Sequence, residues 1–432
     1  MKAKFSFHKA GQGLFYGGRI WDYQEEKTTT VVYDCGTSSF INGNKSALTN
    51  EINNFKHLNY PLKNDNSNEI EIELLFISHL DYDHVSGLGQ LFENFKVKNI
   101  ILPYLEIRER TFSLLSFPDD IDPTYSLSLD DYISFIESPT DFIKEKSEGT
   151  KLFFIKPNKN NEYEGYASNN NNLGYIYRRG TRITEEGLGE ESNVFDNNLQ
   201  FFIQNKWEFT TYVQGVNEGV VNKLHEGLKS LLKIKDDLTI DDLKQLLTSK
   251  RKKAREYYLK HIGEINAHGL VLLHGPINAE YLHTHIDSSS ELNDRHHDFG
   301  YRNKNHDSFF ENKNNLTLKT LLFGDTSLRD NNESKINFPD KFKDKLTAVH
   351  VVQVPHHGAS KNWCFEEFKL LNIGSDINRW ENEVVSVCNF GYGNTYGHPS
   401  HNVLNDLRAT IFLNTQFSRL NIKYCCIIHK TS

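Results

Sequence analysis

Apolar and polar residues alternate along the first hundred positions, and this two-residue period predicts β-strands. A hairpin is expected over residues 4–38, where KFSFHKAGQGLFYGGRI and TTTVVYDCGTS flank the polar turn DYQEEK. The next strand, residues 70–78, alternates and then becomes apolar, as a strand entering a buried sheet does. Residues 85–95 predict a glycine turn and an amphipathic helix, and residues 96–104 predict a parallel strand reached through that helix.

The middle of the chain departs from this regular pattern. Residues 105–195 contain clusters of Pro, Asn and Gly, including ASNNNNLG, and predict an insertion of short elements and loops. Strand-like FFI and WEFTTYV follow. Two helices are then expected, over VNKLHEGLKSLLKI and over residues 238–262. The second helix begins at Thr239 with Asp242 three residues later, which is the spacing of a capping box.

Strand and loop character returns after residue 266. Four segments combine an apolar run with glycine, histidine or aspartate: HGLVLLHG, LKTLLFGDTS, AVHVVQVPHHGAS and NEVVSVCNFGYGNTYGHPS. Strands that alternate with helices along the chain predict an α/β protein.

Composition limits the possible partners. The chain has 49 Lys and Arg against 57 Asp and Glu, a net charge of −8, so any contact with a polyanion must be local. The five cysteines form no C-x-x-C pair, which favours a reducing cytoplasm. The N-terminal segment has no hydrophobic signal core, and no apolar run approaches the ~20 residues of a membrane span. We therefore expect a soluble, cytoplasmic protein without a membrane partner.

The densest chemistry lies in FISHLDYDHVSGL, residues 76–88, which place two histidines and two aspartates within six positions. A solvated polar turn would explain them, because both residue types are common in turns. The flanking strand and helix favour a metal site instead, since open α/β sheets bind ligands at the carboxyl ends of strands. His79 and Asp81 alternate at the strand end and can share one metal ion. The turn that follows directs Asp83 and His84 at a second ion.

In order, these segments resemble the metallo-β-lactamase superfamily, and within it the soluble hydrolase domain of the bacterial DNA-uptake protein ComEC. The superfamily signature H-x-H-x-D-H has its counterpart in HLDYDH, with aspartate at the second ligand position, a variant typical of the ComEC-like branch. The other landmarks occur in family order: GQG (11–13), Asp34-Cys35-Gly36, Gly324-Asp325, PHHGAS (355–360) and YGHPS (396–400). The membrane channel segments of ComEC are absent, so a free-standing relative is expected and transport is not implied.

The resemblance implies an α/β fold, the metallo-β-lactamase αββα sandwich, with a mixed α insertion. It divides the chain into the first half of the fold (1–104), an insertion (105–195), return strands of the core (196–216), a helical insertion (217–262) and the second half of the fold (263–432).

The resemblance also implies a hydrolytic site with two divalent metal ions. Asp325 is expected to bridge the ions and His398 to bind the second one. The implied ligand set is His79, Asp81, Asp83, His84, Asp325 and His398. Aspartate in place of the second histidine hardens this set, which suits Mn²⁺ alongside Zn²⁺. Asp34 would orient a ligand histidine, or simply cap a turn.

The remaining histidine motifs have less definite roles. His356 or His357 would protonate a leaving group or bind a substrate oxygen while the other packs, and together with Asp83 they are the catalytic candidates. The third histidine motif of the superfamily has no clear match, and His268 and His274 are its nearest candidates.

Two further clusters offer alternatives. Lys250, Arg251, Lys252 and Lys253 form a solvated helix face, or else a phosphate-binding patch beside the active site. LHTHID (282–287) and RHHDFG (295–300) also contain metal-type residues. They lie in a connection rich in Ser and Asn without a preceding buried strand, so we interpret them as surface histidines, or as residues of a cleft mouth.

Three classes of function stay open. The leading hypothesis is a metal-dependent phosphodiesterase or nuclease that acts on DNA or RNA. Free-standing relatives recur in bacterial genome defence, so an antiviral, multi-component system with a protein partner would fit. A hydrolase of a lactone, thioester or cyclic nucleotide is the first alternative, favoured by the net negative charge. A regulatory subunit with this fold is the second, although the full set of ligand-type residues speaks against it.

Overall fold

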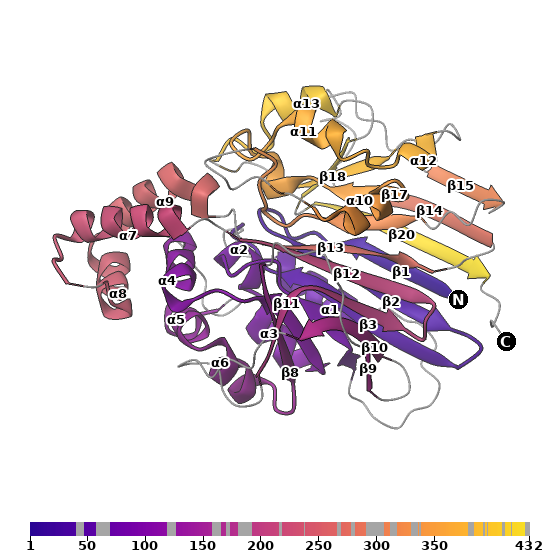
Figure 1. The fold of residues 1–432 in the computed structure, drawn as a ribbon, viewed down its shortest axis with the longest axis horizontal. Helices are drawn as coiled ribbons and strands as arrows, with labels where there is room; N and C mark the ends of the chain where they lie inside the picture. Colours follow the sequence, from indigo (N-terminus) through magenta and orange to yellow (C-terminus); the bar gives the residue numbers. More distant parts are fainter. Residues whose placement is uncertain are drawn as a thin grey trace.

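In a computed structural model, the chain folds into two β-sheets that pack face to face, with helices on their outer faces (Figure 1). The structure describes residues 1–39, 47–57, 70–118, 127–157, 166–169, 173–179, 192–215, 218–236, 238–265, 269–277, 281–290, 306–311, 318–329, 336, 338–378, 384–391, 394, 396–407, 411–415 and 417–427. Within these ranges, no helix is both long enough and apolar enough to cross a membrane.

The first sheet begins with the predicted hairpin. Its antiparallel part contains β20 (Ser418–Ile427), β1 (Lys2–Phe7), β2 (Phe15–Asp22) and β3 (Lys27–Cys35). Its parallel part continues from β3 through β5 (Leu74–Phe76), β7 (Asn99–Pro103) and β8 (Lys151–Lys156). The strand expected before the metal-type motif and the parallel strand expected after it are therefore confirmed.

The second sheet also has an antiparallel part followed by a parallel part. Antiparallel strands come first, β12 (Trp207–Gln214), β13 (Gly269–Pro276) and β16 (Lys319–Leu322). Parallel strands follow from β16, namely β17 (Val349–Gln353), β18 (Val385–Asn389) and β19 (Ile411–Asn414). One long strand, β11 (Ser192–Ile203), joins the two sheets, because its start pairs with β8 and its end with β12.

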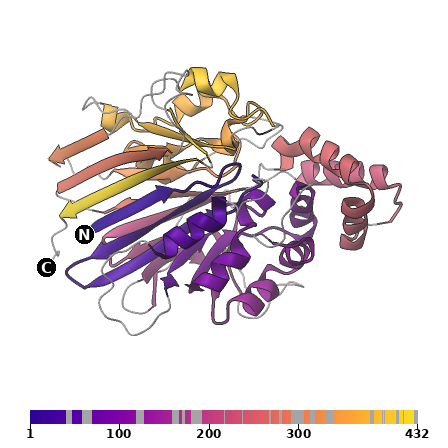
Figure 2. The same cartoon turned by 180° about the vertical axis from the view of Figure 1, so that it is seen from behind.

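Apolar side chains fill three successive layers, which confirms the predicted αββα sandwich. Between the sheets, the rings of Phe76 and Phe209 stack with centroids 5.7 Å apart. The outer face of the first sheet packs against α1 (Ala47–Lys56) and α3 (Leu88–Asn94). The outer face of the second sheet packs near α10 (Asp340–Leu346), α11 (Phe365–Leu370) and α13 (His401–Asp406). The view from behind shows the same layers (Figure 2).

A helical lobe extends from one end of the sandwich (Figures 1 and 2). It contains α4 (Ile107–Arg110), η1 (Thr111–Ser116), α5 (Leu129–Glu137), α6 (Pro139–Lys146), α7 (Glu218–Leu232), α8 (Ile240–Ser249) and α9 (Arg251–Ile265). The predicted capping box is confirmed, since the Asp242 amide donates to the Thr239 hydroxyl and the Thr239 amide donates to the Asp242 carboxylate. The expected long helix over 238–262 is instead two helices, because α8 ends at a C-cap, Lys250.

Another expectation is corrected by the strand pairing. The sequence interpretation places residues 282–287 in a connection rich in Ser and Asn, but they lie in β14 (Tyr281–Ser290), which pairs with β20 along its length. The alternation of Leu, Thr and Ile in this segment is the strand signal that the histidines obscured. The histidines of RHHDFG lie outside the described residues.

The predicted division of the chain into five segments stays a prediction. Two observations bear on its first boundary: β8, inside the segment expected as an insertion, lies beside β7 in the sheet, and the buried face of α5 packs in the same cluster as α3.

An ion-pair cluster connects α1 to the neighbouring strands β1 and β20 of the first sheet. The Glu51 carboxylate accepts hydrogen bonds from His8 Nδ1 at 2.9 Å and from Arg419 Nε at 3.0 Å. Burial alone would raise the pKa of Glu51, but the hydrogen bond from His8 and the charge of Arg419 lower it from 4.5 to about 2. Because the folded-state pKa is lowered, Glu51 contributes stability that is fully present above about pH 4.5 and is lost as the pH falls towards 2.

We therefore expect Glu51→Gln to lower the free energy of unfolding at neutral pH by up to about 3 kcal/mol, with the deficit shrinking below about pH 4. Urea unfolding of both proteins at several pH values measures this difference. A deficit that stays constant from neutral to acidic pH would show that the Glu51 carboxylate is not the source.

Candidate metal centre

The polar residues of the predicted motifs meet where strands from both sheets end. His79 follows β5, Asp325 follows β16, and His356 and His357 lie in η3 (Pro355–Gly358) after β17. Asp83 lies in α2 (Tyr82–Val85), the short helix after β5. The carboxyl ends of strands are where open α/β sheets bind ligands, so the location agrees with the sequence-based expectation.

Two glycines let the turn around Asp83 approach its neighbours. A Cβ atom on Gly13 would lie 2.4 Å from the Asp83 carbonyl oxygen, and a Cβ on Gly36 would lie 2.5 Å from the same atom. Gly13 also has a φ of +141°, which other residues rarely adopt. A side chain at either position would therefore push the motif away from the strand ends, which gives a physical reason for glycine in GQG and DCG.

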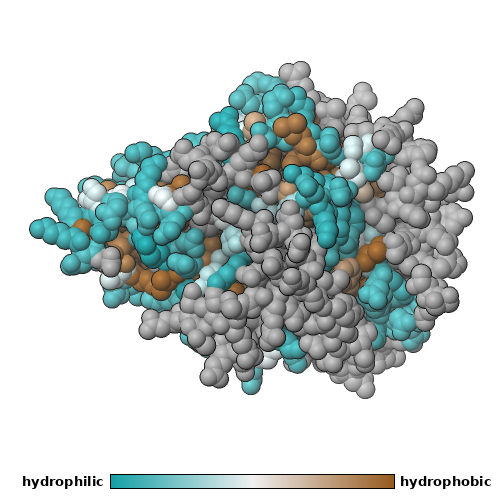
Figure 3. Space-filling view, in the orientation of Figure 1, coloured by the Kyte–Doolittle hydropathy of each residue, from teal (hydrophilic) through white to brown (hydrophobic). Residues whose placement is uncertain are grey.

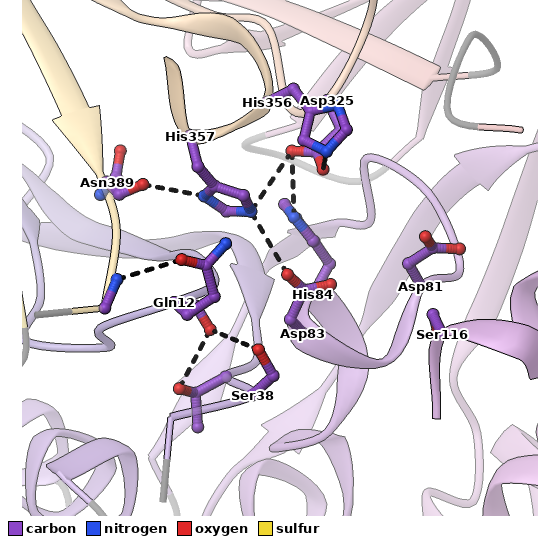
Figure 4. A network of polar contacts seen from close by, with 12 residues as sticks. Gln12, Ser38, Asp81, Asp83, His84, Ser116, Asp325, His356, His357 and Asn389 are labelled. Carbon is purple, nitrogen blue, oxygen red and sulfur yellow. Dashed lines mark hydrogen bonds and ion pairs between the residues drawn. The ribbon is translucent and has the colours of Figure 1, made fainter. Parts of the chain in front are cut away.

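Three histidines have one ring nitrogen held by the protein scaffold. Nδ1 of His79 lies 2.8 Å from Ser78 Oγ, and Nδ1 of His84 lies 2.8 Å from Asp34 Oδ2. Nδ1 of His357 donates to the Asn389 carbonyl oxygen at 2.8 Å (Figure 4). The Nε2 atoms of all three rings are buried and make no hydrogen bond to any described residue. Imidazoles that are fixed through one nitrogen and direct the other nitrogen into a shared site are typical of metal ligands.

The Asp325 carboxylate lies at the point on which these rings converge. Its oxygens lie 3.2 Å from Nε2 of His84, 3.6 Å from that of His356, 3.7 Å from that of His357 and 3.8 Å from that of His79. Figure 4 shows His84 and His357 directed towards this carboxylate from opposite elements. Nitrogen atoms of four imidazoles therefore surround one carboxylate.

Two groups of residues have ligand atoms close enough together to hold a metal ion. The first contains His79, His84 and Asp325, and the second contains Asp83, His84 and His357, with the ligand atoms of each group within 4.8 Å of one another. The groups share His84, so they form one connected centre. Nitrogen and carboxylate donors in this mixture suit divalent ions such as Zn²⁺ and Mn²⁺.

The electrostatics of the centre favour a bound cation. Asp34, Asp81 and Asp325 are buried, and Asp83 is nearly so. Burial would raise the pKa of Asp325, but the charges of His357, His356 and His84 hold it well below its usual range. Burial lowers the pKa of His79 to about 3, so this ring is neutral and able to donate its lone pair. Buried carboxylates need paired positive charge, which a metal ion held by these residues would provide.

The backbone of PHHG adopts a rare conformation. His356 and His357 have φ values of 46° and 53°, and Gly358 follows with 76°. Left-handed residues other than glycine cost on the order of 1–3 kcal/mol each and cluster at functional sites. Here the conformation brings both ring Nε2 atoms towards Asp325, whereas successive side chains of an extended strand would point to opposite faces. Both histidines therefore face the centre, although one of them was expected only to pack.

Other predicted site residues lie around this centre. Asp34 accepts hydrogen bonds from the Ser78 amide, the Ser78 hydroxyl and the His84 ring, in the position expected of a residue that orients a ligand histidine. Asp81 Oδ2 is 4.0 Å from His79 Nε2 and accepts a hydrogen bond from Tyr258 at 2.5 Å. Burial raises the pKa of Asp81 to about 7. Its role as a metal ligand stays a prediction.

His398 lies next to the centre rather than within either group. Its ring centroid is 5.6 Å from that of His356 and 6.4 Å from that of His357. Burial lowers its pKa to about 3. The sequence interpretation made His398 the ligand of the second ion, whereas the geometry puts the Nε2 atom of His357 beside Asp83 at 3.3 Å.

The two candidates for the third histidine motif give no support to that assignment. His274 is buried between the sheets, where its ring nitrogens bond the hydroxyl of Tyr16 and the indole of Trp207. His268 lies outside the residues that the structure describes.

The four cationic candidates lie where α8 meets α9. Lys250 ends α8, and Lys252 and Lys253 are exposed in the first turn of α9. Arg251 is the first residue of α9, and its side chain is outside the described part. Tyr258 on the same helix reaches Asp81, so at 1.5 Å per residue the exposed lysines begin about 8 Å along the axis from this contact.

Sequence reasoning missed Tyr258, Ser78 and Asn389. Ser78 and Asn389 had a weak signal, since both come at the end of an apolar strand beside a recognised motif. Tyr258 had none, because it belongs to a helix 177 positions from Asp81.

Replacing each of two histidines by alanine separates the two assignments. Loss of a residue that only hydrogen-bonds a metal ligand weakens metal binding by about 10- to 100-fold. We expect His357→Ala to weaken the binding of Zn²⁺ or Mn²⁺ by more than this, because a ligand nitrogen is removed. His398→Ala should weaken it less than about tenfold. Calorimetric titration of metal-stripped proteins measures both, and circular dichroism controls for folding. The opposite ranking would restore His398 as the ligand.

Comparison with known families agrees with this geometry. Residues 23–143 match the family model of the metallo-beta-lactamase superfamily, a segment that runs from the β2–β3 turn through the His79–His84 motif into α6. It crosses the predicted boundary between residues 104 and 105. No curated protein matches the chain. The matched segment, the sandwich and the His/Asp groups together indicate a metallo-beta-lactamase superfamily domain with the features of a metal-dependent hydrolase.

Proposed function

We propose that this protein is a metal-dependent phosphodiesterase that cleaves DNA or RNA. The observation that carries the proposal is the contact between the metal centre and α9, a helix whose first six residues include four Lys and Arg residues against one Glu. The whole chain has a net charge of −8, so this excess of positive charge is local. It favours a polyanionic substrate over a neutral one.

Each residue of the centre has a role under this proposal. His79, Asp83, His84, Asp325 and His357 would hold divalent ions, which supply Lewis acidity and lower the pKa of water. Asp34 and the carbonyl of Asn389 keep two of the ligand rings in the required orientation.

We assign proton transfer to His356, the other buried histidine of η3. Both ring nitrogens of His357 have partners: Nδ1 donates to the Asn389 carbonyl oxygen, and Nε2 lies beside the carboxylates of Asp83 and Asp325. No backbone carbonyl of the described residues accepts a hydrogen bond from Nδ1 of His356. The His356 ring is therefore less committed than that of His357, and it would protonate the leaving oxygen.

The first experiment tests metal-dependent hydrolysis. We expect metal-stripped protein to regain cleavage of single-stranded DNA, single-stranded RNA or bis-p-nitrophenyl phosphate with Mn²⁺ at least as well as with Zn²⁺, because the ligand set includes two carboxylates. Asp83→Ala should lose at least about 100-fold in kcat while keeping its circular dichroism spectrum. Hydrolysis of a lactone or thioester bond without any phosphodiester cleavage would replace this proposal with a small-molecule hydrolase.

The second experiment tests the exposed cations of α9. Figure 3 shows a largely hydrophilic surface over the helical lobe. Joint replacement of Lys250, Arg251, Lys252 and Lys253 by glutamine should weaken cleavage of single-stranded nucleic acid and flatten its salt dependence, by about 0.7 in log–log slope for each phosphate that is no longer neutralised. Bis-p-nitrophenyl phosphate hydrolysis should survive, since it needs only the metal centre. Unchanged cleavage of both substrates would return these residues to an ordinary solvated helix face.

A further inference from the structure

Arg255 lies between two tyrosines at the edge of the metal centre. Its guanidinium carbon is 5.5 Å from the ring centroid of Tyr258 and 5.0 Å from that of Tyr396, and it donates a hydrogen bond to the Tyr396 hydroxyl. Cation–π contacts on two sides hold the guanidinium group in place. A long side chain that is usually mobile is therefore fixed.

Both tyrosines connect Arg255 directly to residues of the centre. The Tyr258 hydroxyl donates to Asp81, and the Tyr396 ring lies nearly parallel to that of His398, at 11° with centroids 6.0 Å apart. These contacts come from opposite sides, since Tyr258 belongs to α9 and Tyr396 to the loop after β18. Arg255 thus bridges the helical lobe and the sandwich next to the metal ligands.

The loop of the histidine pair also reaches α9. Lys361, three residues after Gly358, donates a hydrogen bond to the Leu259 carbonyl oxygen at 3.0 Å. The position of α9 over the centre is therefore fixed by Tyr258 and Leu259 as well as by Arg255.

Arg255 has no carboxylate partner among the residues that the structure describes. A guanidinium group has five N–H donors, and the hydrogen bond to Tyr396 uses one of them. Arg419, which is similarly half-buried, pairs with Glu51. A fixed, partly buried guanidinium group with unused donors beside a metal centre is suited to bind an oxyanion.

We infer that Arg255 binds a phosphate group of the substrate beside the metal centre and is a residue that determines the preference for polyanionic substrates. The inference rests on the proposed phosphodiesterase function and deepens it, because it names the residue that receives a substrate phosphate. The planar guanidinium group offers two parallel N–H donors to phosphate oxygens, while the tyrosine faces exclude water from its other surfaces. The exposed lysines earlier in α9 then continue the positive track away from the centre.

Steady-state kinetics on a short single-stranded oligonucleotide test the inference. Arg255→Gln should raise KM at least about tenfold with a smaller change in kcat, because hydrogen bonds to a charged phosphate are lost. Arg255→Lys should recover part of the loss, since it restores the charge without the fork of donors. Lys260→Gln, which removes an exposed charge from the second half of the same helix, is the matched control and should behave as the wild type.

Equilibrium binding of the same fluorescent oligonucleotide to metal-free protein provides a readout that needs no turnover. Arg255→Gln should raise the Kd by a similar factor, with metal affinity unchanged. Equal KM and Kd in wild type and Arg255→Gln would overturn the inference, as would a loss of metal binding that matches the loss of activity, because Arg255 would then only brace the fold. Arg255-dependent binding without any hydrolysis would support the phosphate site and reject the phosphodiesterase proposal.

Discussion

The burial of Asp325 is the constraint on which the rest of the structure depends. Its carboxylate is 2% exposed and lies within 3.8 Å of imidazole nitrogens from four histidines. An isolated buried carboxylate is strongly unfavourable, so its surroundings must provide positive charge as protons or as metal ions. Two overlapping sets of ligand atoms around it are close enough together to hold metal ions, which would provide this charge.

The scaffold explains how such a centre can form reproducibly. The sandwich brings strand ends from two sheets to one place, and β11 joins those sheets by pairing with both. Gly13 and Gly36 have no side chain, so the turn that carries Asp83 can lie close to them. Hydrogen bonds with Ser78, Asp34 and Asn389 fix the orientations of the ligand histidine rings. Together they fix the positions of the ligand atoms, and functional sites require such groups to be held within about 0.5 Å of the productive geometry.

The sequence predicted most of the strands because strand periods and turn residues are local signals, whereas the sandwich was implied by the resemblance to the metallo-β-lactamase superfamily. It predicted His79, Asp83, His84 and Asp325 because each follows an apolar strand in a recognisable motif. It could not predict which of His357 and His398 lies closer to Asp83. The left-handed backbone that directs both η3 histidines towards Asp325 cannot be recognised from the residue types. It also missed Tyr258 and Arg255, because contacts between a helical lobe and a distant loop have no sequence period.

The lobe gives the common fold its own chemistry. Fold alone does not determine function, and a metal centre of this kind could hydrolyse ester bonds of many classes of substrate. Arg255 and the exposed lysines of α9 place positive charge on one side of the centre, and Tyr258 connects the same helix to Asp81, all in a segment beyond the matched family region.

Anomalous diffraction from crystals of Mn²⁺-saturated protein tests the central claim most directly. The account predicts a peak within about 2.0–2.3 Å of His84 Nε2 and of an Asp325 oxygen, bounded by His79 or by His357 and Asp83. An ion bound elsewhere, or saturated crystals with no peak beside Asp325, would contradict the account.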